Sequence, residues 1–178
     1  MTRLSQPEII TQKRLIKLFT DKMDYAYLGD WSDRDNNSNI EEELLTKNLV
    51  ERQYTKVQIS KAIDKLKRSA NDNTKSLYQR NQDVFNHLRY GIQVKLESSK
   101  PTQTIHLIDW NDIEVNQFSI AEEVTLKGNL ERRPDLVFYI NGIAICVLEL
   151  KSSIVSIPQG IRQSISNQQP RFNEWFYT

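Results

Sequence analysis

The sequence predicts an α/β protein in which a mixed central sheet is flanked by helices and the N-terminal half is helical. The main observation is a change of period. Apolar residues recur every three or four positions up to about residue 90, whereas from residue 92 they alternate or form short apolar runs. The 178 residues are 38% hydrophobic and 26% charged, which is typical of a folded domain and excludes collagen-like and low-complexity chains.

The first helix is predicted to begin at Ser5, where Ser5 and Glu8 can form a capping box around Pro7. Its buried stripe comprises Ile9, Gln12, Ile16 and Phe19, with Leu15 and Leu18 beside it. Further helices are predicted over residues 40–53, 57–66, 77–88 and 161–167, and residues 25–39 are predicted to form a loop with Gly29 in a turn. Residues 40–90 are therefore a helical portion within a single domain, residues 1–178.

The second half is predicted to supply the sheet. Residues 92–96 and parts of 104–110 and 118–126 alternate apolar and polar, as half-buried antiparallel strands do. Residues 136–140 and 143–150 are apolar on both faces and are joined by Asn141-Gly142, a strong hairpin signal. Such a hairpin is expected at the centre of a sheet, covered on both faces, with Cys146 as a small core residue.

Charge and composition exclude several classes of protein. The net charge of +1 does not indicate a nucleic-acid binder. His87 and His106 lie far apart and are predicted to be structural or surface residues, so with one cysteine a zinc site is not expected. A lone cysteine, no apolar run near the ~20 residues of a membrane span and no signal peptide predict a soluble cytoplasmic chain without a membrane partner. A basic cluster is either a solvated helix face or a phosphate-contacting patch: Lys56, Lys61, Lys65, Lys67 and Arg68.

The candidate chemistry lies where the hairpin opens. Asp135 follows Arg133-Pro134, and after thirteen further residues come Glu149, Leu150 and Lys151. Charges beside a buried hairpin cost several kcal/mol each unless they are paired or bound to a metal. Asp135 and Glu149 can supply oxygen ligands to a hard divalent cation, with the Leu150 carbonyl and waters completing an octahedral shell. Lys151 can then orient the attacking water or stabilise developing negative charge. Alternatively, these charges are strand-end residues paired with one another and with Arg133.

The turn decides whether the two carboxylates share a face of the hairpin. A plain two-residue turn at Asn141-Gly142 sets Asp135 opposite Leu148, so that its side chain faces away from Glu149. A three-residue turn, with Gly142 in the left-handed region as a bulge, shifts the pairing and brings both carboxylates to one face. A metal site therefore predicts the bulged turn, or another bulge further along the hairpin.

Residues 132–151, RRPDLVFYINGIAICVLELK, closely resemble the nuclease segment of the restriction (R) subunit of type I restriction-modification enzymes, which is a PD-(D/E)xK nuclease. The similarity extends back through residues 107–110 and 116–118 to the helical half, and forward through 160–176. It implies a PD-(D/E)xK, restriction-endonuclease-like core. It also implies Mg²⁺-dependent cleavage of double-stranded DNA, with Mn²⁺ as a possible substitute.

The resemblance also implies residue roles. Asp135 and Glu149 would be metal ligands and Lys151 the third catalytic residue. Gln163 matches a catalytic-region glutamine of related nucleases, although Asn167 stands where they carry a tyrosine. Some relatives place a glutamate of the first helix near the metal. Glu8 is the candidate for that position, and the capping box explains it equally well.

The chain contains no G-x-x-x-x-G-K-[ST] phosphate-binding loop, so the ATP-driven motor of such subunits is not expected within it. Aromatic residues close to the end of the chain suggest the N-terminal fragment of a longer restriction subunit. The resemblance then implies double-stranded DNA and the modification and specificity subunits as partners of the full-length subunit. The alternative is a non-catalytic DNA-binding or subunit-interaction module with the same fold.

Overall fold

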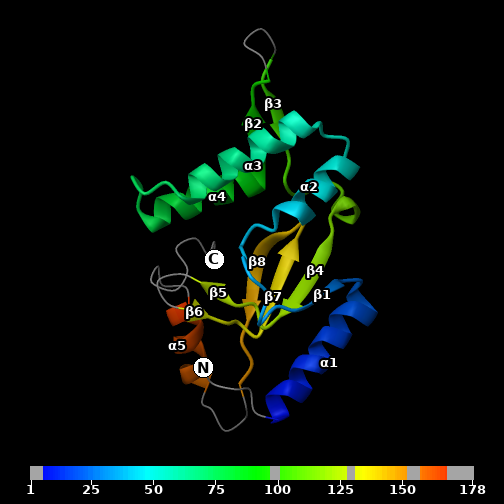
Figure 1. Cartoon of the computed structure of the whole chain (residues 1–178), viewed down its shortest axis with the longest axis vertical. Coiled ribbons are helices and arrows are strands. Elements are labelled where there is room, and N and C mark those ends of the chain that lie inside the picture. Colours follow the sequence, from blue (N-terminus) through cyan, green and yellow to red (C-terminus); the bar gives the residue numbers. More distant parts are fainter. Residues whose placement is uncertain (1–5, 97–100, 128–130, 152–156, 168–178) are drawn as a thin grey trace. The chain divides into compact units, whose positions relative to one another are not determined.

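The computed structural model describes residues 6–96, 101–127, 131–151 and 157–167 (Figure 1). The chain forms two compact units. The first contains residues up to 38, residues 118–139 and the chain from 144 to the last described helix, and the second contains residues 39–117 and 140–143. Among the described helices, none is both long and apolar enough to cross a membrane.

The first unit is built on a four-stranded sheet in the order β1-β4-β7-β8 (Figure 1). The strands are β1 (Ala26–Asp30), β4 (Phe118–Glu122), β7 (Leu136–Ile140) and β8 (Ile143–Leu148). β1 runs parallel to β4, whereas β7 and β8 are joined by a tight turn, so the predicted mixed sheet is confirmed. The antiparallel arrangement predicted within residues 118–126 was wrong for the pairing of β4 with β1. The unit also contains α1 (Gln6–Met23), the antiparallel pair β5 (Leu126–Lys127) and β6 (Glu131–Arg132), and α5 (Ile157–Asn167).

The inward stripe of α1 and the strands share one apolar core. Phe19 contacts the rings of Tyr25 and Phe138, with centroids 5.1 and 4.7 Å apart. Leu15 and Ile16 pack on the same cluster, as the helical spacing predicts, whereas Leu18 is exposed. Ser5, the predicted cap, lies outside the described residues. The core comprises Ile120, Leu136 and Phe138, with Leu15, Ile16, Phe19, Tyr25 and Leu148 packed against it.

The predicted loop over residues 25–39 was wrong for its first part, which forms β1. The predicted turn at Gly29 was also wrong, because this glycine lies within the strand. The register against β4 shifts between Tyr27 and Gly29, and Gly29 takes φ +105°. This irregularity removes the alternation by which a strand is recognised, so only pairing with β4 reveals it.

The hairpin differs from the prediction in its surroundings. The first four residues of β7 are buried, but β8 is the last strand of the sheet in the described part of the chain. Ile145 and Cys146 are both exposed. The expectation of full cover on both faces, with Cys146 in the core, was therefore wrong for β8. A doubly apolar run does not distinguish a central strand from an edge strand that is covered only in part.

The hairpin turn is the two-residue kind. β7 ends at Ile140 and β8 begins at Ile143, and Asn141 and Gly142 take φ values of +53° and +82°. Positive φ at both central residues defines a type I′ turn, whose twist matches that of the strands. The three-residue bulged turn predicted from the metal site was therefore wrong, although Gly142 does take the predicted positive φ. A site that uses both carboxylates then requires the other predicted feature, a bulge further along the hairpin, which remains a prediction. Asparagine tolerates the left-handed region, which allows the tighter turn.

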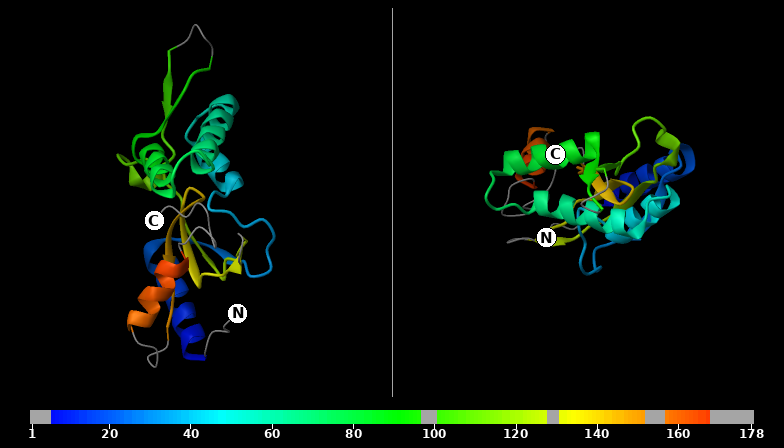
Figure 2. Two further views of the ribbon diagram at one scale, coloured as in Figure 1. Left: turned by 90° about the vertical axis from the view of Figure 1, so that its left-hand side faces the viewer. Right: turned by 90° about the horizontal axis from the view of Figure 1, so that it is seen from above.

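The second unit is helical with a small sheet. Figure 2 shows α3 and α4 side by side. Thr55 with Gln58, and Ser76 with Gln79, form capping boxes that begin α3 and α4. The elements are α2 (Glu42–Glu51), α3 (Lys56–Ala70), α4 (Leu77–Tyr90), the antiparallel strands β2 (Ile92–Val94) and β3 (Gln103–Ile105), and the 3-10 turn η1 (Ile113–Val115). The three helices confirm the helical spacing of this region, and the strands are shorter than predicted.

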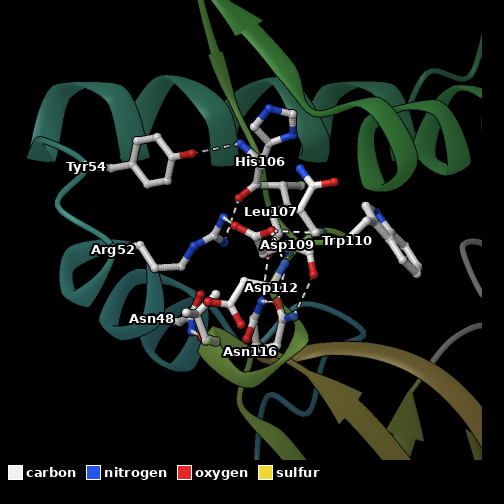
Figure 3. A network of polar contacts seen from close by, with 12 residues as sticks. Asn48, Arg52, Tyr54, His106, Leu107, Asp109, Trp110, Asp112 and Asn116 are labelled. Atoms are coloured by element: carbon white, nitrogen blue, oxygen red, sulfur yellow. Dashed lines mark hydrogen bonds and ion pairs between the residues drawn. The ribbon is translucent and has the colours of Figure 1, made fainter.

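Polar side chains organise the loop that follows β3 (Figure 3). Asp109 Oδ1 accepts the backbone N–H groups of Asn111 and Asp112, each at 3.0 Å, and Asp109 Oδ2 pairs with Arg52 at 3.1 Å. The N–H of Asp112, then that of Asn111, holds the pKa of the Asp109 carboxyl below its ordinary value. Asn116 Nδ2 donates to the Asp109 carbonyl at 2.8 Å. The loop is thus fixed by side chains that cap its own backbone.

The same network holds the hairpin tip within the second unit. Asn141 Nδ2 donates to the Leu107 carbonyl and to Asn116 Oδ1, each at 2.8 Å, and Asn141 Oδ1 accepts the Gln117 N–H at 2.7 Å. Asn141 has no exposed surface. Its side chain therefore makes three hydrogen bonds to backbone or amide groups of the second unit, so its own buried amide is satisfied.

We expect the stability of the protein to fall as pH falls below the ordinary histidine pKa of 6.5. His87 is half-buried, with Nε2 2.8 Å from Ser69 Oγ. Burial first, and then the charge of Lys65, lower its pKa, with Lys75 acting in the same direction and Asp83 against it. The unfolded chain therefore binds a proton before the folded one does, and acidification favours unfolding.

The check is thermal unfolding of the wild type and of His87→Gln between pH 5 and pH 7.5. The glutamine variant should lose part of the acid destabilisation, because it cannot be protonated. His106→Gln, at an exposed histidine of the same unit, is the control and should keep the wild-type profile. Identical profiles for wild type and His87→Gln would contradict the assignment.

Candidate active site

Asp135 is the buried carboxylate of the candidate site. It directly precedes β7 and is 6% exposed. Its Oδ2 accepts the backbone N–H of Leu150 at 2.5 Å. Leu150 lies two residues beyond the end of β8, so the Asp135 carboxylate lies against the main chain of the Glu149-Leu150-Lys151 segment. The two parts of the predicted motif therefore meet, through a backbone contact that the paired-strand argument did not include.

Burial raises the pKa of the Asp135 carboxyl above its ordinary value. The Leu150 N–H and the Lys151 ammonium act in the opposite direction, and the charge of Glu8 adds to the rise. A buried carboxylate with a like charge nearby is unfavourable unless a cation or further donors compensate it. The Leu150 N–H and the charges of Lys151 and Arg133 offset part of this cost, and a bound cation would offset more of it.

Glu149 and Lys151 lie next to each other at this end of the sheet. The Glu149 side chain is 5% exposed and that of Lys151 is 26% exposed. The Lys151 ammonium lies 3.8 Å from Glu149 Oε2, which is near the limit for an ion pair. Lys151 therefore remains partly open to solvent, while the Glu149 side chain is buried.

The structural alternative expected Lys151 and Arg133 to pair with the candidate carboxylates. The pair of Lys151 with Glu149 is present, whereas Arg133 pairs with a different glutamate. The Arg133 Nε lies 2.9 Å from Glu123 Oε2. Glu123 directly follows β4, and its own backbone N–H donates to the Asp135 carbonyl at 3.0 Å. Burial is the main reason that the pKa of the Glu123 carboxyl is raised, and the charge of Arg133 opposes it. Arg133 therefore pairs with Glu123, a residue that is hydrogen-bonded to Asp135 and that the sequence analysis did not single out.

The chain matches the family described as "Type I restriction enzyme R protein N terminus" over residues 5–178. The chain belongs to this family. It is 34% identical over 73 residues to a protein described as the type I restriction enzyme MjaVIIIP endonuclease subunit of Methanocaldococcus jannaschii, with 39% of this chain and 7% of that protein covered. It is 36% identical over 71 residues to the MjaVIIP endonuclease subunit of the same organism, with 39% of this chain and 6% of that protein covered.

The match therefore spans less than a tenth of the length of these relatives. No solved structure matches the chain. The family assignment confirms the resemblance to the R subunit of type I restriction enzymes, and the PD-(D/E)xK core remains a prediction.

Carboxylate and carbonyl oxygen atoms, such as those of Asp135, Glu149 and Leu150, suit hard cations such as Mg²⁺ and Mn²⁺ better than softer metals such as Zn²⁺ or Cu²⁺. Among the residues that the structure describes, no three His, Cys, Asp or Glu side chains form a metal-holding group. A cation bound here would take its ligands from Asp135, Glu149, the Leu150 carbonyl and water. Mg²⁺ is commonly held in this way, by one or two carboxylates and several waters.

For two other predicted site residues, Glu8 and Gln163, the structure gives fewer contacts. Glu8 lies in the first turn of α1, is partly buried, and is close enough to Asp135 to influence its pKa. Gln163 lies in α5, as the helical pattern predicted, but its side chain and that of Asn167 lie outside the described residues. The metal role of Glu8 and the catalytic role of Gln163 remain predictions.

Proposed function

We propose that this chain is the Mg²⁺-dependent endonuclease part of a type I restriction R subunit, with the PD-(D/E)xK core that the resemblance implies, and that it hydrolyses phosphodiester bonds of double-stranded DNA. The observation that carries the proposal is the hydrogen bond from the Leu150 N–H to the Asp135 carboxylate. It brings the aspartate to the Glu-Leu-Lys segment in a buried setting. Membership of the R-protein family supports the same conclusion.

The proposed mechanism assigns a role to each residue of the candidate site. Asp135 and Glu149 bind the cation, together with the Leu150 carbonyl, and Glu8 is a possible further ligand. Bound Mg²⁺ would neutralise phosphate charge and lower the pKa of a coordinated water. Lys151 orients the attacking water or donates to a phosphoryl oxygen as negative charge develops. In the hydrolysis, the water oxygen bonds to phosphorus, the bond to one sugar oxygen breaks, and a phosphate end and a hydroxyl end result.

The test is incubation of supercoiled plasmid with this chain and with the longer subunit, each with Mg²⁺, with Mn²⁺ and with chelator. Nicked and linear products that require a divalent cation are expected from the longer subunit. In the complete enzyme, ATP would act only through the motor, and the modification and specificity subunits would select the DNA. No cation-dependent cleavage by the longer subunit in the presence of its partners would refute the proposal.

We expect Lys151→Ala to lose about 100-fold or more in cleavage rate while it keeps the wild-type affinity for Mg²⁺ or Mn²⁺, or gains slightly. The ammonium repels a nearby cation but stabilises charge in the transition state. Calorimetric titration and plasmid cleavage measure the two effects separately. Metal binding that disappears with Lys151 would indicate that its contact with Glu149, 3.8 Å long, only holds the site together.

A second candidate function, a subunit-interaction module, is favoured by exposed aromatic residues of α4. Tyr78, Phe85 and Tyr90 are 75%, 60% and 66% exposed. Exposed aromatic residues are typical of protein interfaces. Plasmid cleavage by the longer subunit separates the two candidate functions. If this part of the subunit were only an interaction module, replacement of Asp135 would leave the cleavage rate unchanged.

The structure gives less support to a non-catalytic DNA-binding module, in which the basic residues of α3 would contact phosphate. The basic cluster of this helix is largely bonded within the chain, which leaves these lysines less available to phosphate. Lys61 donates to the Lys95 and Leu96 carbonyls at 2.7 and 3.2 Å, Lys65 to the Gln93 carbonyl at 3.3 Å, and Lys67 pairs with Glu42 at 2.7 Å.

A further inference from the structure

Gln12 is a buried amide on the inward face of α1. It is 3% exposed and belongs to the stripe whose apolar members pack on the core. Its Nε2 is surrounded by oxygen atoms: Glu122 Oε2 lies at 3.0 Å, the Asp135 carbonyl at 3.3 Å and Glu123 Oε1 at 3.4 Å. A buried polar group is tolerated when it is hydrogen-bonded, and here a single nitrogen contacts three residues.

The chemistry of this contact depends on the amide. Its NH₂ group offers two hydrogens and carries no charge. It can therefore donate to the carboxylates of Glu122 and Glu123 without neutralising their negative charge, as a lysine or arginine would. The same nitrogen donates to the main-chain carbonyl of Asp135, so its two hydrogens are shared among three acceptors. Gln12 thus links α1 directly to the residue whose carboxylate defines the candidate site.

The Asp135 carbonyl is held by a second donor, the backbone N–H of Glu123 at 3.0 Å. Glu123 takes φ +52°, a left-handed conformation that residues other than glycine rarely adopt without a compensating constraint. Its carboxylate is anchored by Arg133. Two donors from different parts of the unit therefore fix the backbone of Asp135, while its carboxylate bonds to Leu150.

We propose that Gln12 is a positioning residue for Asp135: through the Asp135 carbonyl it holds the metal-binding carboxylate in place, so the affinity for a divalent cation depends on its amide donor. This inference rests on the proposed function, since it takes Asp135 as a metal ligand. Groups that orient metal ligands typically change metal affinity or activity by about 10- to 100-fold when they are removed. A role in packing alone would change stability without changing cation affinity.

The test uses Gln12→Met, which keeps the length of the side chain and removes the donor. Calorimetric titration with Mn²⁺ should show an affinity about tenfold or more below that of the wild type. Plasmid cleavage by the longer subunit should lose kcat with little change in KM for DNA. Gln12→Asn, which keeps an amide but withdraws it by one methylene, should lie between the two and provides a second variant if the methionine form does not fold.

The matched control is Ile16→Val, one helical turn further along the same stripe and packed on the same core. It should lose stability but bind Mn²⁺ as the wild type does. Wild-type affinity in folded Gln12→Met or Gln12→Asn would overturn the inference, provided that Asp135→Asn abolishes binding. A wild-type protein that binds no Mn²⁺, or an Asp135→Asn variant that binds it normally, would instead overturn the proposed function, and the inference with it.

Discussion

Asp135→Asn and Glu149→Gln should each reduce cation-dependent plasmid cleavage by at least about 1,000-fold. Each substitution removes a charged ligand, and metal ions contribute several kcal/mol of transition-state stabilisation, where each 1.4 kcal/mol or so is tenfold in rate. Both changes keep the size of the side chain, so the effect would not arise from a cavity. Cleavage by the longer subunit and its variants, at fixed Mg²⁺, measures it.

The folding of these variants should be intact. Asp135 is 6% exposed and its charge is opposed by burial, so a neutral amide at this position removes an unfavourable term. Its oxygen can still accept the Leu150 N–H. We therefore expect the Tm of Asp135→Asn to equal or exceed that of the wild type in the absence of metal.

A suitable control is Glu43→Gln, at an exposed carboxylate of α2, which should cleave as the wild type does. Near wild-type cleavage by Asp135→Asn or Glu149→Gln would contradict the catalytic assignment. A large fall in Tm would show instead that the carboxylate is needed for folding.

The helices of the second unit could be predicted from the sequence because their signals are local. Ile59, Ile63 and Leu66 follow helical spacing and are buried in α3. The capping residue Thr55 lies directly before that helix. Both signals are contained within one or two turns of chain, so no knowledge of the tertiary structure is required.

The strands were predicted less well because their environment is not local. β1 contains Gly29 at positive φ and lacks alternation, so only its partner β4 makes it a strand. Similarly, the apolar run of β8 predicted burial, but Ile145 is 37% exposed. Hydrophobicity alone does not indicate which strand of a sheet lies at its edge.

In the candidate site too, residues with a local sequence signal could be predicted and residues that depend on distant contacts could not. Asp135, Glu149 and Lys151 were found because they form a motif within a short stretch of sequence. Gln12 contacts Glu122, Glu123 and the Asp135 carbonyl across 110, 111 and 123 residues. The one available signal was a glutamine within an otherwise apolar stripe, which indicates a buried partner but does not identify it.

Gly142→Ala should destabilise the protein by roughly 2–5 kcal/mol, a large part of the 5–15 kcal/mol typical of a folded protein. Gly142 takes φ +82°, where an alanine costs about 1–2 kcal/mol. A Cβ at this position would lie 2.7 Å from the Glu41 carbonyl oxygen and from Leu44 Cβ, and 3.0 Å from the Leu45 nitrogen. Overpacking of this kind adds about 1–3 kcal/mol.

The clash cannot be relieved by a side-chain rotation, because two of the three nearest atoms belong to the backbone where α2 begins. The Glu41 N–H also donates to the Gly142 carbonyl at 2.8 Å, and Ile40 bridges to Ile143. Separating the turn from α2 would therefore break these contacts and disturb Leu45, which has no exposed surface. The loss should appear as a Tm lower by roughly 4–20 °C, at about 2–4 °C per kcal/mol for a chain of this length.

Gly29→Ala separates the two contributions. Gly29 also takes a positive φ, +105°, but a Cβ there would meet nothing within 4 Å. This variant should therefore show the conformational cost alone, about 1–2 kcal/mol, and its Tm should fall less than that of Gly142→Ala. Equal losses in the two variants would mean that α2 yields to the added methyl group, and that the contact of the turn with α2 does not constrain the hairpin tip.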